Sequence, residues 1–287
     1  MAALFAADYG LGSIADHDVT KEELLDKMNK MKEKYTSIIQ SKPVAEQNTP
    51  QWKEERLERL TSSNFGKVCR LRDTTNRYNT VKSILYTAWS GNAATMYGHD
   101  QESVSEDMYK DFISKNYVGA SIKEINHPGL LAIDESPELA ASPDGIATVD
   151  CPTLPPKILL EYKNPKSLVD KRLSVNDAID TIPNFPLQMA GNKYTLKKSH
   201  PFYYQIQGAL KATKLSLCHL VLRGYNSIAV VDVPFDHIFY EAQAAKLRVF
   251  YFNYILPELA HPLFQYGGIR DCLGVDPDEF VSSCGAL

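Results

Sequence analysis

Apolar side chains in the N-terminal part of the chain recur at helical spacing. Between residues 20 and 41 they stand three or four positions apart, which is the period of an amphipathic helix; the positions are Leu24, Leu25, Met28, Met31, Tyr35 and Ile38. Thr20 to Glu23 has the form of a capping box at the start of this helix. A linker with prolines at positions 43 and 50 follows. We therefore interpret residues 1–50 as an appended helical extension and linker.

Two further helical patterns follow the linker. Residues 51–68 predict a helical turn and then a second helix, for which residues 61–63 supply an N-cap. Residues 93–117 predict a longer helix, with Glu102 in its N-terminal half. Its apolar stripe is formed by Met96, Val104, Met108 and Phe112.

The centre of the chain has the pattern of a β-hairpin. An apolar run ends in Glu161-Tyr162-Lys163, and residues 139–149 are a partner strand bent at Pro143-Asp144-Gly145. Residues 151–156 supply the turn between the two strands. Because successive side chains of a strand point to opposite faces, Glu161 and Lys163 share one face. The hairpin also predicts that Asp144 lies beside Glu161.

The C-terminal half alternates between the two periods. Residues 164–200 are polar and are predicted to be rich in loops, whereas residues 201–214 predict a helix. Residues 215–223 and 227–235 predict two strands about a turn, and Asp236 caps a helix that reaches about residue 259. The tail, residues 261–287, has no strong period. This order predicts an α/β fold with a mixed central β-sheet flanked by helices.

Composition restricts the class of protein. The chain has 287 residues, of which 44% are hydrophobic and 23% charged, as in a soluble globular protein. Its five cysteines are scattered without a C-x-x-C pair, which favours a reducing compartment over a disulfide framework or a zinc site. No apolar run is long enough to span a membrane and the N-terminus lacks a secretory pattern. We expect an intracellular protein.

Charge is distributed unevenly. The net charge is -4, but residues 163–214 hold nine Lys or Arg against three acids, a local excess of +6. A basic strip of this kind suits contacts with phosphates. The alternative is a solvated basic face with no ligand.

The hairpin also carries candidate chemistry. Two neighbouring carboxylates, Asp144 and Glu161, repel one another unless a cation lies between them, and their oxygens suit Mg²⁺ or Mn²⁺. Lys163 would orient or activate a water. This is the arrangement that a metal-dependent phosphodiesterase needs. The alternative is a surface cross-strand pair of little energetic weight.

Five ordered motifs extend this pattern. They are Trp52-x3-Arg56-x4-Thr61-x-Ser63, Gly98-x3-Glu102, Asp134-Glu135-Ser136 followed by Ser142-Pro143-Asp144-Gly145, Glu161-Tyr162-Lys163, and Gln205-x-Gln207. With them the chain resembles, over about residues 51–250, the phage-lambda-type alkaline exonucleases, also called the YqaJ viral recombinase family, of the PD-(D/E)xK nuclease superfamily. The resemblance implies a restriction-endonuclease-like core, a YqaJ-like exonuclease domain at residues 51–260 and a C-terminal tail at residues 261–287.

The resemblance implies roles for individual residues. Asp144 and Glu161 would be the principal metal ligands, and Glu102 and Asp134 would complete or support the site. Lys163 would position the attacking water. The residues that match the family's hold on the terminal 5′-phosphate and the DNA are Arg56, Thr61, Ser63, Ser142, Gln205 and Gln207.

The implied activity is Mg²⁺-dependent 5′-to-3′ digestion of one strand of linear duplex DNA, with Mn²⁺ able to substitute, in recombination or repair of a viral or mobile-element type. Implied partners are DNA ends, a single-strand annealing recombinase and the other subunits of a ring-shaped trimer. The long 164–200 segment and the N-terminal extension depart from the family and could cover or replace a trimer interface. The alternatives are an endonuclease of the same superfamily or a DNA-binding recombination protein with weak nuclease activity.

Overall fold

The computed structural model describes residues 46–47, 49–72, 74–86 and 93–263, together with eight isolated positions between residues 22 and 33. These eight positions are helical, as the predicted helix of the N-terminal extension requires. The rest of that extension, and the tail beyond residue 263, lie outside the described residues. None of the described helices is long and apolar enough to cross a membrane.

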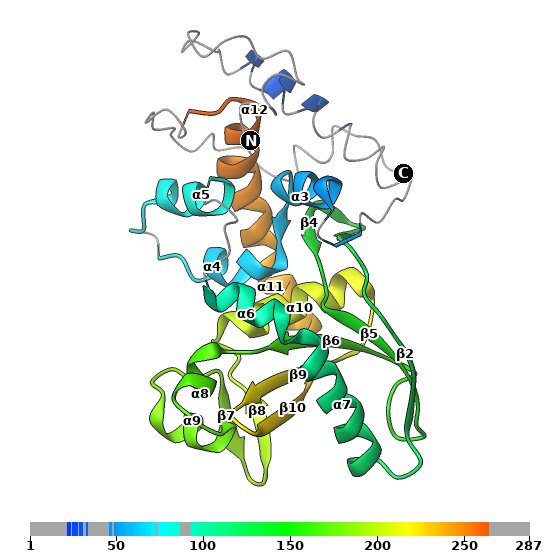
Figure 1. Cartoon of the computed structure of the whole chain (residues 1–287). Coiled ribbons are helices and arrows are strands. Elements are labelled where there is room, and N and C mark those ends of the chain that lie inside the picture. Colours follow the sequence, from blue (N-terminus) through cyan, green and yellow to red (C-terminus); the bar gives the residue numbers. More distant parts are fainter. Residues whose placement is uncertain are drawn as a thin grey trace.

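A mixed five-stranded sheet forms the centre of the fold, in the order β10-β9-β6-β5-β2 (Figure 1). The strands are β2 (Ser121–Asn126), β5 (Gly145–Asp150), β6 (Lys157–Lys163), β9 (Leu217–Gly224) and β10 (Ser227–Pro234). The β6–β9 pair is parallel and the other pairs are antiparallel. The predicted α/β fold with a mixed sheet is therefore confirmed, and so are the two hairpins.

Helices cover both faces of this sheet. On one face, Tyr109 and Ile113 of α7 (Glu102–Asn116) pack with Ile158, Leu160 and other buried side chains of the strands. On the other face, Ile206 and Leu210 of α10 (Pro201–Thr213) pack with Leu159. Because β6 alternates, Tyr162 faces α7, whereas Glu161 and Lys163 lie on the α10 side.

A second, smaller sheet adjoins the first. It has the order β1-β4-β3, with β1 (Leu60–Thr61) parallel to β4 (Ser136–Ala141) and β3 (Leu131–Ile133) antiparallel to it. Residues 139–149 are thus two strands, β4 and β5, in two sheets, and the single bent strand that we predicted is wrong. The proline at position 143 explains the break, because it has no backbone N–H for a ladder bond.

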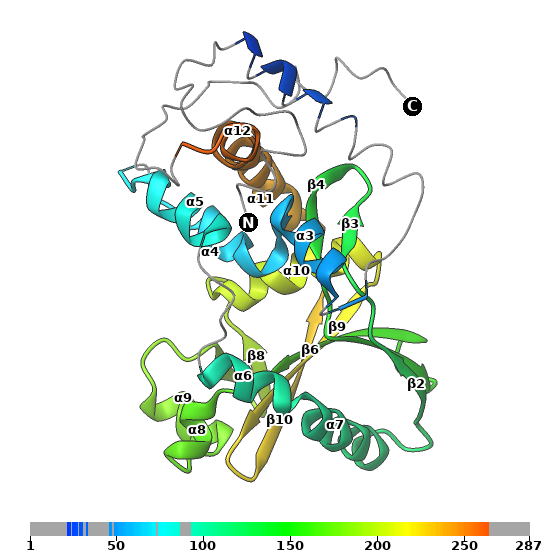
Figure 2. The same ribbon diagram turned by 45° about the horizontal axis from the view of Figure 1, so that its top comes forward.

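A group of helices lies beside the small sheet (Figures 1 and 2). It contains α3 (Pro50–Leu57), the 3₁₀ turn η1 (Ser62–Asn64), α4 (Phe65–Cys69), α5 (Arg77–Leu85), α11 (His237–Phe250), the π-helical turn η2 (Tyr251–Ile255) and α12 (Leu256–Ala260). Asp236 caps α11 by accepting from Phe239 N, as predicted. Leu25 of the N-terminal extension packs against the apolar cluster of this group.

Two other predictions need correction. The 93–117 helix is divided into α6 (Ala93–Asp100) and α7, and Met96 and Val104 of its expected apolar stripe are 60% and 39% exposed. The buried row of α7 is instead Ser105, Tyr109 and Ile113, anchored by a 2.8 Å hydrogen bond between the Tyr109 hydroxyl and His219 Nδ1.

The 164–200 segment, predicted to be loop-rich, contains regular structure. It forms α8 (Lys166–Asp170), α9 (Val175–Thr181), β7 (Leu187–Ala190) and β8 (Lys193–Leu196), which lie together beside the central sheet (Figure 1). Elements of four to seven residues are too short to show a clear hydrophobic period, so the sequence pattern did not reveal them.

Candidate active site

The hairpin β5–β6 brings the central candidate residues together. Its register pairs Gly145 with Leu160, so Asp144 lies next to Glu161. The backbone N–H of Tyr162 donates to Asp144 Oδ2 over 2.7 Å. Lys163 Nζ is 2.5 Å from Glu161 Oε1, in keeping with the shared face that the strand period predicted.

The surroundings of this trio are unfavourable for two bare carboxylates. Glu161 is only 2% exposed. Burial, with the nearby charge of Asp144, raises the pKa of Glu161 to about 7. Burial also raises the pKa of Asp144 to about 6; Lys163 opposes this rise and Glu102 adds to it. Burial lowers the pKa of Lys163, but the attraction of Glu161 and Asp144 outweighs it and the net pKa is raised. The site has more negative charge than Lys163 alone neutralises.

Glu102 lies close enough to act on these charges. It is the first residue of α7 and lines, with Glu106, His127 and Tyr162 among others, a cavity of about 360 Å³. Its carboxylate raises the pKa of Asp144. The structure therefore places Glu102 beside the Asp144 end of the site, on the side of β6 that carries Tyr162.

Asp134 is not brought to this site. It lies in the turn between β3 and β4, is 55% exposed and pairs with Lys214 over 2.6 Å. At about 3.3 Å per residue, β4 separates it from the Asp144 turn by roughly 17 Å. Helix α10 agrees, because Gln205 contacts Glu161 whereas Lys214, nine residues later, contacts Asp134, a rise of about 13 Å. The structure therefore does not bring Asp134 to the carboxylate pair, and its role as a metal ligand stays a prediction.

The carboxylates of Asp144 and Glu161 suit a hard divalent cation that takes only a few of its ligands from the protein. In the part of the chain that the structure describes, no group of three or more His, Cys, Asp or Glu side chains is assembled as a metal site. Mg²⁺ commonly takes one or two carboxylates and keeps several waters. Asp144 and Glu161 match this requirement, and the pKa rise that each gains from burial shows that a cation would stabilise their ionised forms.

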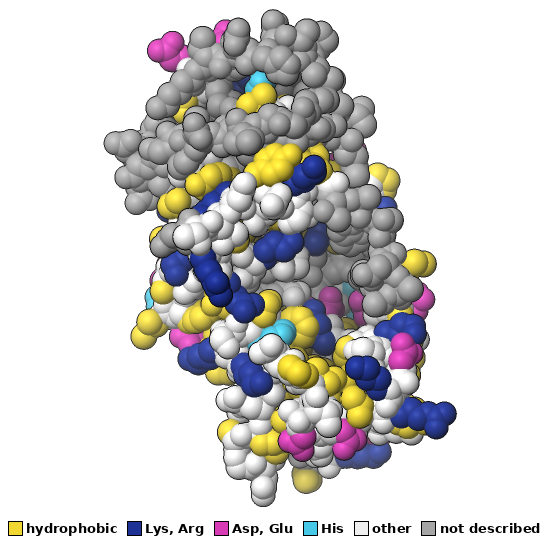
Figure 3. Space-filling model, turned by 90° about the vertical axis from the view of Figure 1, so that its left-hand side faces the viewer, with side chains coloured by type: hydrophobic (Ala, Val, Ile, Leu, Met, Phe, Trp, Pro, Cys, Tyr) yellow, Lys and Arg dark blue, Asp and Glu magenta, His cyan; other side chains and the backbone are white. Residues whose placement is uncertain are grey.

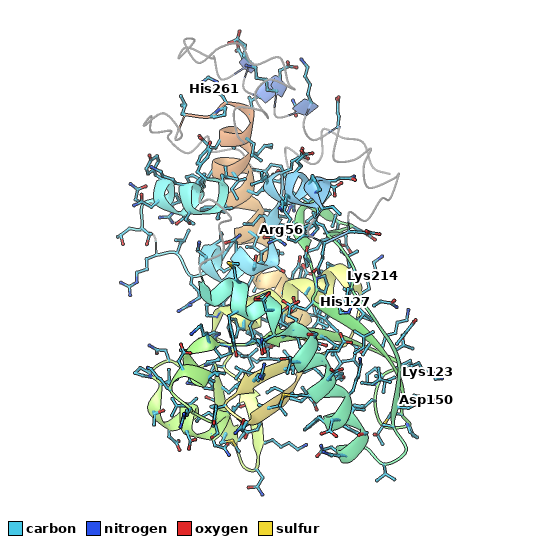
Figure 4. All side chains as sticks on the ribbon, viewed as in Figure 1. Arg56, Lys123, His127, Asp150, Lys214 and His261 are labelled. Carbon is cyan, nitrogen blue, oxygen red and sulfur yellow. The ribbon has the colours of Figure 1, made fainter. Side chains whose placement is uncertain are left out.

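A second group of residues is organised by Trp52 on α3. Its indole Nε1 donates to Ser142 Oγ over 2.9 Å, and the Arg56 guanidinium stacks over its ring at 4.5 Å. Burial lowers the pKa of Arg56 to about 10, which leaves it charged at neutral pH. Arg56 and Ser142, two of the predicted phosphate-binding residues, thus meet on one aromatic side chain, and Ser142 is two residues from Asp144. Figure 4 labels Arg56 above His127, whose ring contacts the carbonyl of Asp144.

Ser63 reaches the same region through the small sheet. Thr61 pairs with Ala140 in parallel register, so the residues two positions further along, Ser63 and Ser142, leave the sheet at the same end. Ser63 is exposed, whereas Thr61 is buried and its hydroxyl lies 3.1 Å from that of Ser63. Thr61 is thus placed as a brace for Ser63, and its direct contact with DNA stays a prediction.

The two glutamines of α10 have different environments. Gln205 Nε2 donates to Glu161 Oε1 over 2.5 Å, so its amide lies at the carboxylates. Gln207 is fully buried, donates to Pro234 O and accepts from Asp236 N. Residues two apart on a helix point in nearly opposite directions, so both cannot face one ligand. The structure places Gln207 away from the carboxylates, with its amide joining α10 to the loop before α11, and its DNA contact stays a prediction.

Sequence reasoning missed several residues that hold the site. The Gln47 side chain donates to the carbonyls of Pro128 and Pro143, and His127 Nδ1 donates to the carbonyl of Asp144 over 2.7 Å. Asn164 ties the end of β6 to Gly98 and Ser105. Their partners are distant in sequence, so no local pattern predicted these contacts.

Comparisons with known proteins agree with this fold. The family model of the YqaJ-like viral recombinase domain matches residues 51–214. A crystal structure of LHK-Exo in complex with dAMP is similar at a TM-score of 0.51 and 19% identity, covering 76% of this chain and 95% of that one. A second crystal structure, of the alkaline exonuclease LHK-Exo from Laribacter hongkongensis, gives 0.50 and 19% with the same coverage. No curated protein matches the chain.

The helix-flanked mixed sheet, with two carboxylates and a lysine where β5 meets β6, defines a nuclease enzyme. The family model covers more than half of the sequence, and the chain belongs to the family of YqaJ-like viral recombinase domains. The resemblance inferred from the five sequence motifs is confirmed.

Proposed function

We propose that this protein is a divalent-metal-dependent exonuclease that degrades one strand of linear duplex DNA from its 5′ end. The observation that supports the proposal most directly is the meeting of two groups at one turn. Asp144, Glu161 and Lys163 form a carboxylate and lysine site, and Arg56 and Ser142 adjoin it through Trp52. The residues for phosphodiester hydrolysis therefore lie next to those for binding a strand end.

Asp144 and Glu161 would hold Mg²⁺ or Mn²⁺, with Glu102 acting on the charge of the site. When bound, the ion supplies positive charge against the phosphate in the transition state. Lys163 donates a hydrogen bond that can orient a water for attack on phosphorus, and its ammonium adds further positive charge. Gln205 holds one oxygen of Glu161, so it fixes the direction in which that carboxylate points.

Recognition of the strand end would fall to Arg56, Ser63 and Ser142. A guanidinium and two hydroxyls form charge-assisted and neutral hydrogen bonds with a terminal phosphate. Stacking on Trp52 limits the freedom of Arg56, so less entropy is lost when the phosphate binds. Such a pocket suits a terminal phosphate better than a continuing backbone, and this favours an exonuclease over an endonuclease.

Basic residues near the site supply contacts with the rest of the duplex. Lys67, Arg70 and Lys82 of the α4–α5 region are exposed. Dark blue Lys and Arg side chains gather on the face of the molecule shown in Figure 3. Sequence-independent contacts with phosphates of this kind suit an enzyme that advances along DNA. The 3′-ended single strand left behind would be a substrate for a single-strand annealing recombinase.

The test compares linear with covalently closed circular duplex DNA of the same sequence, each with Mg²⁺ and with a chelator. We expect release of mononucleotides from the linear duplex with Mg²⁺ and no digestion with chelator. The circular duplex should stay intact. Cleavage of the circle at a similar rate would indicate an endonuclease, and digestion in chelator would contradict the metal-dependent site.

A further inference from the structure

Gln47 lies in the linker ahead of the region that the family model matches. It belongs to a tight turn, in which Thr49 N and Thr49 Oγ1 both donate to the carbonyl of Glu46. The same Thr49 caps α3 by accepting from Trp52 N. Thr49 therefore joins the turn that contains Gln47 directly to α3, the helix that carries Trp52 and Arg56.

The side chain of Gln47 joins two segments that are far apart in sequence. Its Nε2 donates to Pro143 O over 2.8 Å and to Pro128 O over 3.1 Å. A primary amide nitrogen carries two N–H donors, so these two bonds use both. The Gln47 side chain thus cross-links the loop that contains Pro128 to the loop that contains Pro143.

The Gln47 cross-link lies just past the end of the β2–β5 ladder, where the two strands no longer pair. The β2–β5 ladder ends at Asn126 paired with Ile146, and both chains then cross into the small sheet. The next residues include Pro128 and Pro143, which have no backbone N–H and cannot extend the ladder. The Gln47 amide provides one donor to each of these two carbonyls.

The turn that carries Asp144 depends on such contacts at each residue. Ser142 accepts from Trp52, Pro143 accepts from Gln47, and the carbonyl of Asp144 accepts from His127. Without the Gln47 bond, the peptide immediately before Asp144 loses the donor that Gln47 supplies and can rotate, and a rotation there moves the Asp144 carboxylate away from Glu161.

We propose that Gln47 is a positioning residue of the metal site. Its amide cross-links the 127–128 and 142–144 loops and fixes the place of Asp144 beside Glu161, so the segment before the family domain contributes to metal affinity. This inference rests on the proposed function, in which Asp144 and Glu161 hold the ion. Loss of a supporting hydrogen bond of this kind typically costs about 10-fold to 100-fold in metal affinity or activity.

The test uses Gln47→Met in the full-length protein, because methionine keeps the length of the side chain and removes both donors. Gln51→Met is the matched control: Gln51 is an exposed glutamine four residues away that bonds only to the side chain of Glu55 among the contacts described. Mn²⁺ binding is measured without DNA from the loss of the free-ion electron paramagnetic resonance signal, and thermal unfolding is followed in parallel.

We expect Gln47→Met to raise the Kd for Mn²⁺ by about 10-fold, and Gln51→Met to change it by less than about 2-fold. Unchanged Mn²⁺ affinity in Gln47→Met, with or without a lower Tm, would overturn the positioning role. Gln47→Asn, whose shorter amide cannot reach both carbonyls, gives the same decision if the methionine variant does not fold. Wild-type protein that neither binds Mn²⁺ nor digests DNA would contradict the proposed function instead.

Discussion

The two carboxylates of the site lie side by side but are held in different ways. Glu161 lies in strand β6, where it pairs with Leu220 of β9, one residue beyond the end of the β5–β6 ladder. Asp144 lies in a turn between two sheets and is held by bonds from side chains that are distant in the sequence. Ladder bonds hold the backbone of Glu161 in place, whereas the backbone at Asp144 depends on individual side chains.

The largest loss of turnover is expected in three single variants, each of which removes the charge of one residue of the site. Asp144→Asn, Glu161→Gln and Lys163→Met keep the side-chain volumes and should each lower turnover by at least ~100-fold, since each removes a ligand or the group that orients water. Single-turnover digestion of linear duplex measures this effect. DNA binding in chelator should persist, and near-wild-type turnover in any two variants would remove the catalytic assignment.

Arg56 tests the side of the turn that recognises the strand end. We expect wild-type protein to digest a 5′-phosphorylated duplex faster than a 5′-hydroxyl duplex, and Arg56→Ala to reduce this preference about 10-fold, the value of one charge-assisted hydrogen bond. Lys53→Ala, at an exposed position of the same helix, is the control. If Arg56 only braces α3, its variant will lower Tm and slow both substrates equally.

The two glutamines of α10 separate function from stability. Gln205→Ala should slow digestion by up to about 10-fold with little change in Tm, because it frees one oxygen of Glu161. Gln207→Ala should do the reverse, since it removes a fully buried amide and leaves the half-buried N–H of Asp236 without that partner, at a cost of about 1–3 kcal/mol in the free energy of unfolding. Rates per folded molecule and thermal unfolding, measured on both variants, decide the matter. Equal rates in the two variants would show that Gln205 does not act on the site.

A pair of truncations asks whether the N-terminal extension serves the fold or the Asp144 turn. Removing residues 1–45 keeps the 46–49 turn, and removing residues 1–48 takes Gln47 away but keeps the Thr49 cap. Both proteins should fold with a slightly lower Tm, because Leu25 leaves the apolar cluster. Only the second should need about 10-fold more metal for half-maximal digestion. An insoluble first truncation would show that residues 1–50 belong to the main core.

Sequence predicted the parts of the site that depend on local periodicity. The shared face of Glu161 and Lys163 follows from the strand repeat, and the approach of Asp144 follows from the register of one hairpin. Gln47 was missed because its partners are 81 and 96 residues away and nothing in its own segment is periodic. The motif names two glutamines but does not say which one faces the carboxylates; helical geometry lets only one of them do so, and in the structure it is Gln205.

The smallest effect is expected at Asp134, which stands ten residues before Asp144 and shares the acidic character of the site residues. An extended strand carries it away from the site, and its exposed pair with Lys214 contributes little. Asp134→Asn should therefore change the turnover and the metal concentration for half-maximal activity by less than about 2-fold. Asp144→Asn, the same substitution at the other end of β4, is its matched comparison. If Asp134→Asn instead lowers activity and extra Mg²⁺ restores it, the β3–β4 turn must reach the metal when DNA is bound. Asp134 would then be a third ligand beside Asp144 and Glu161.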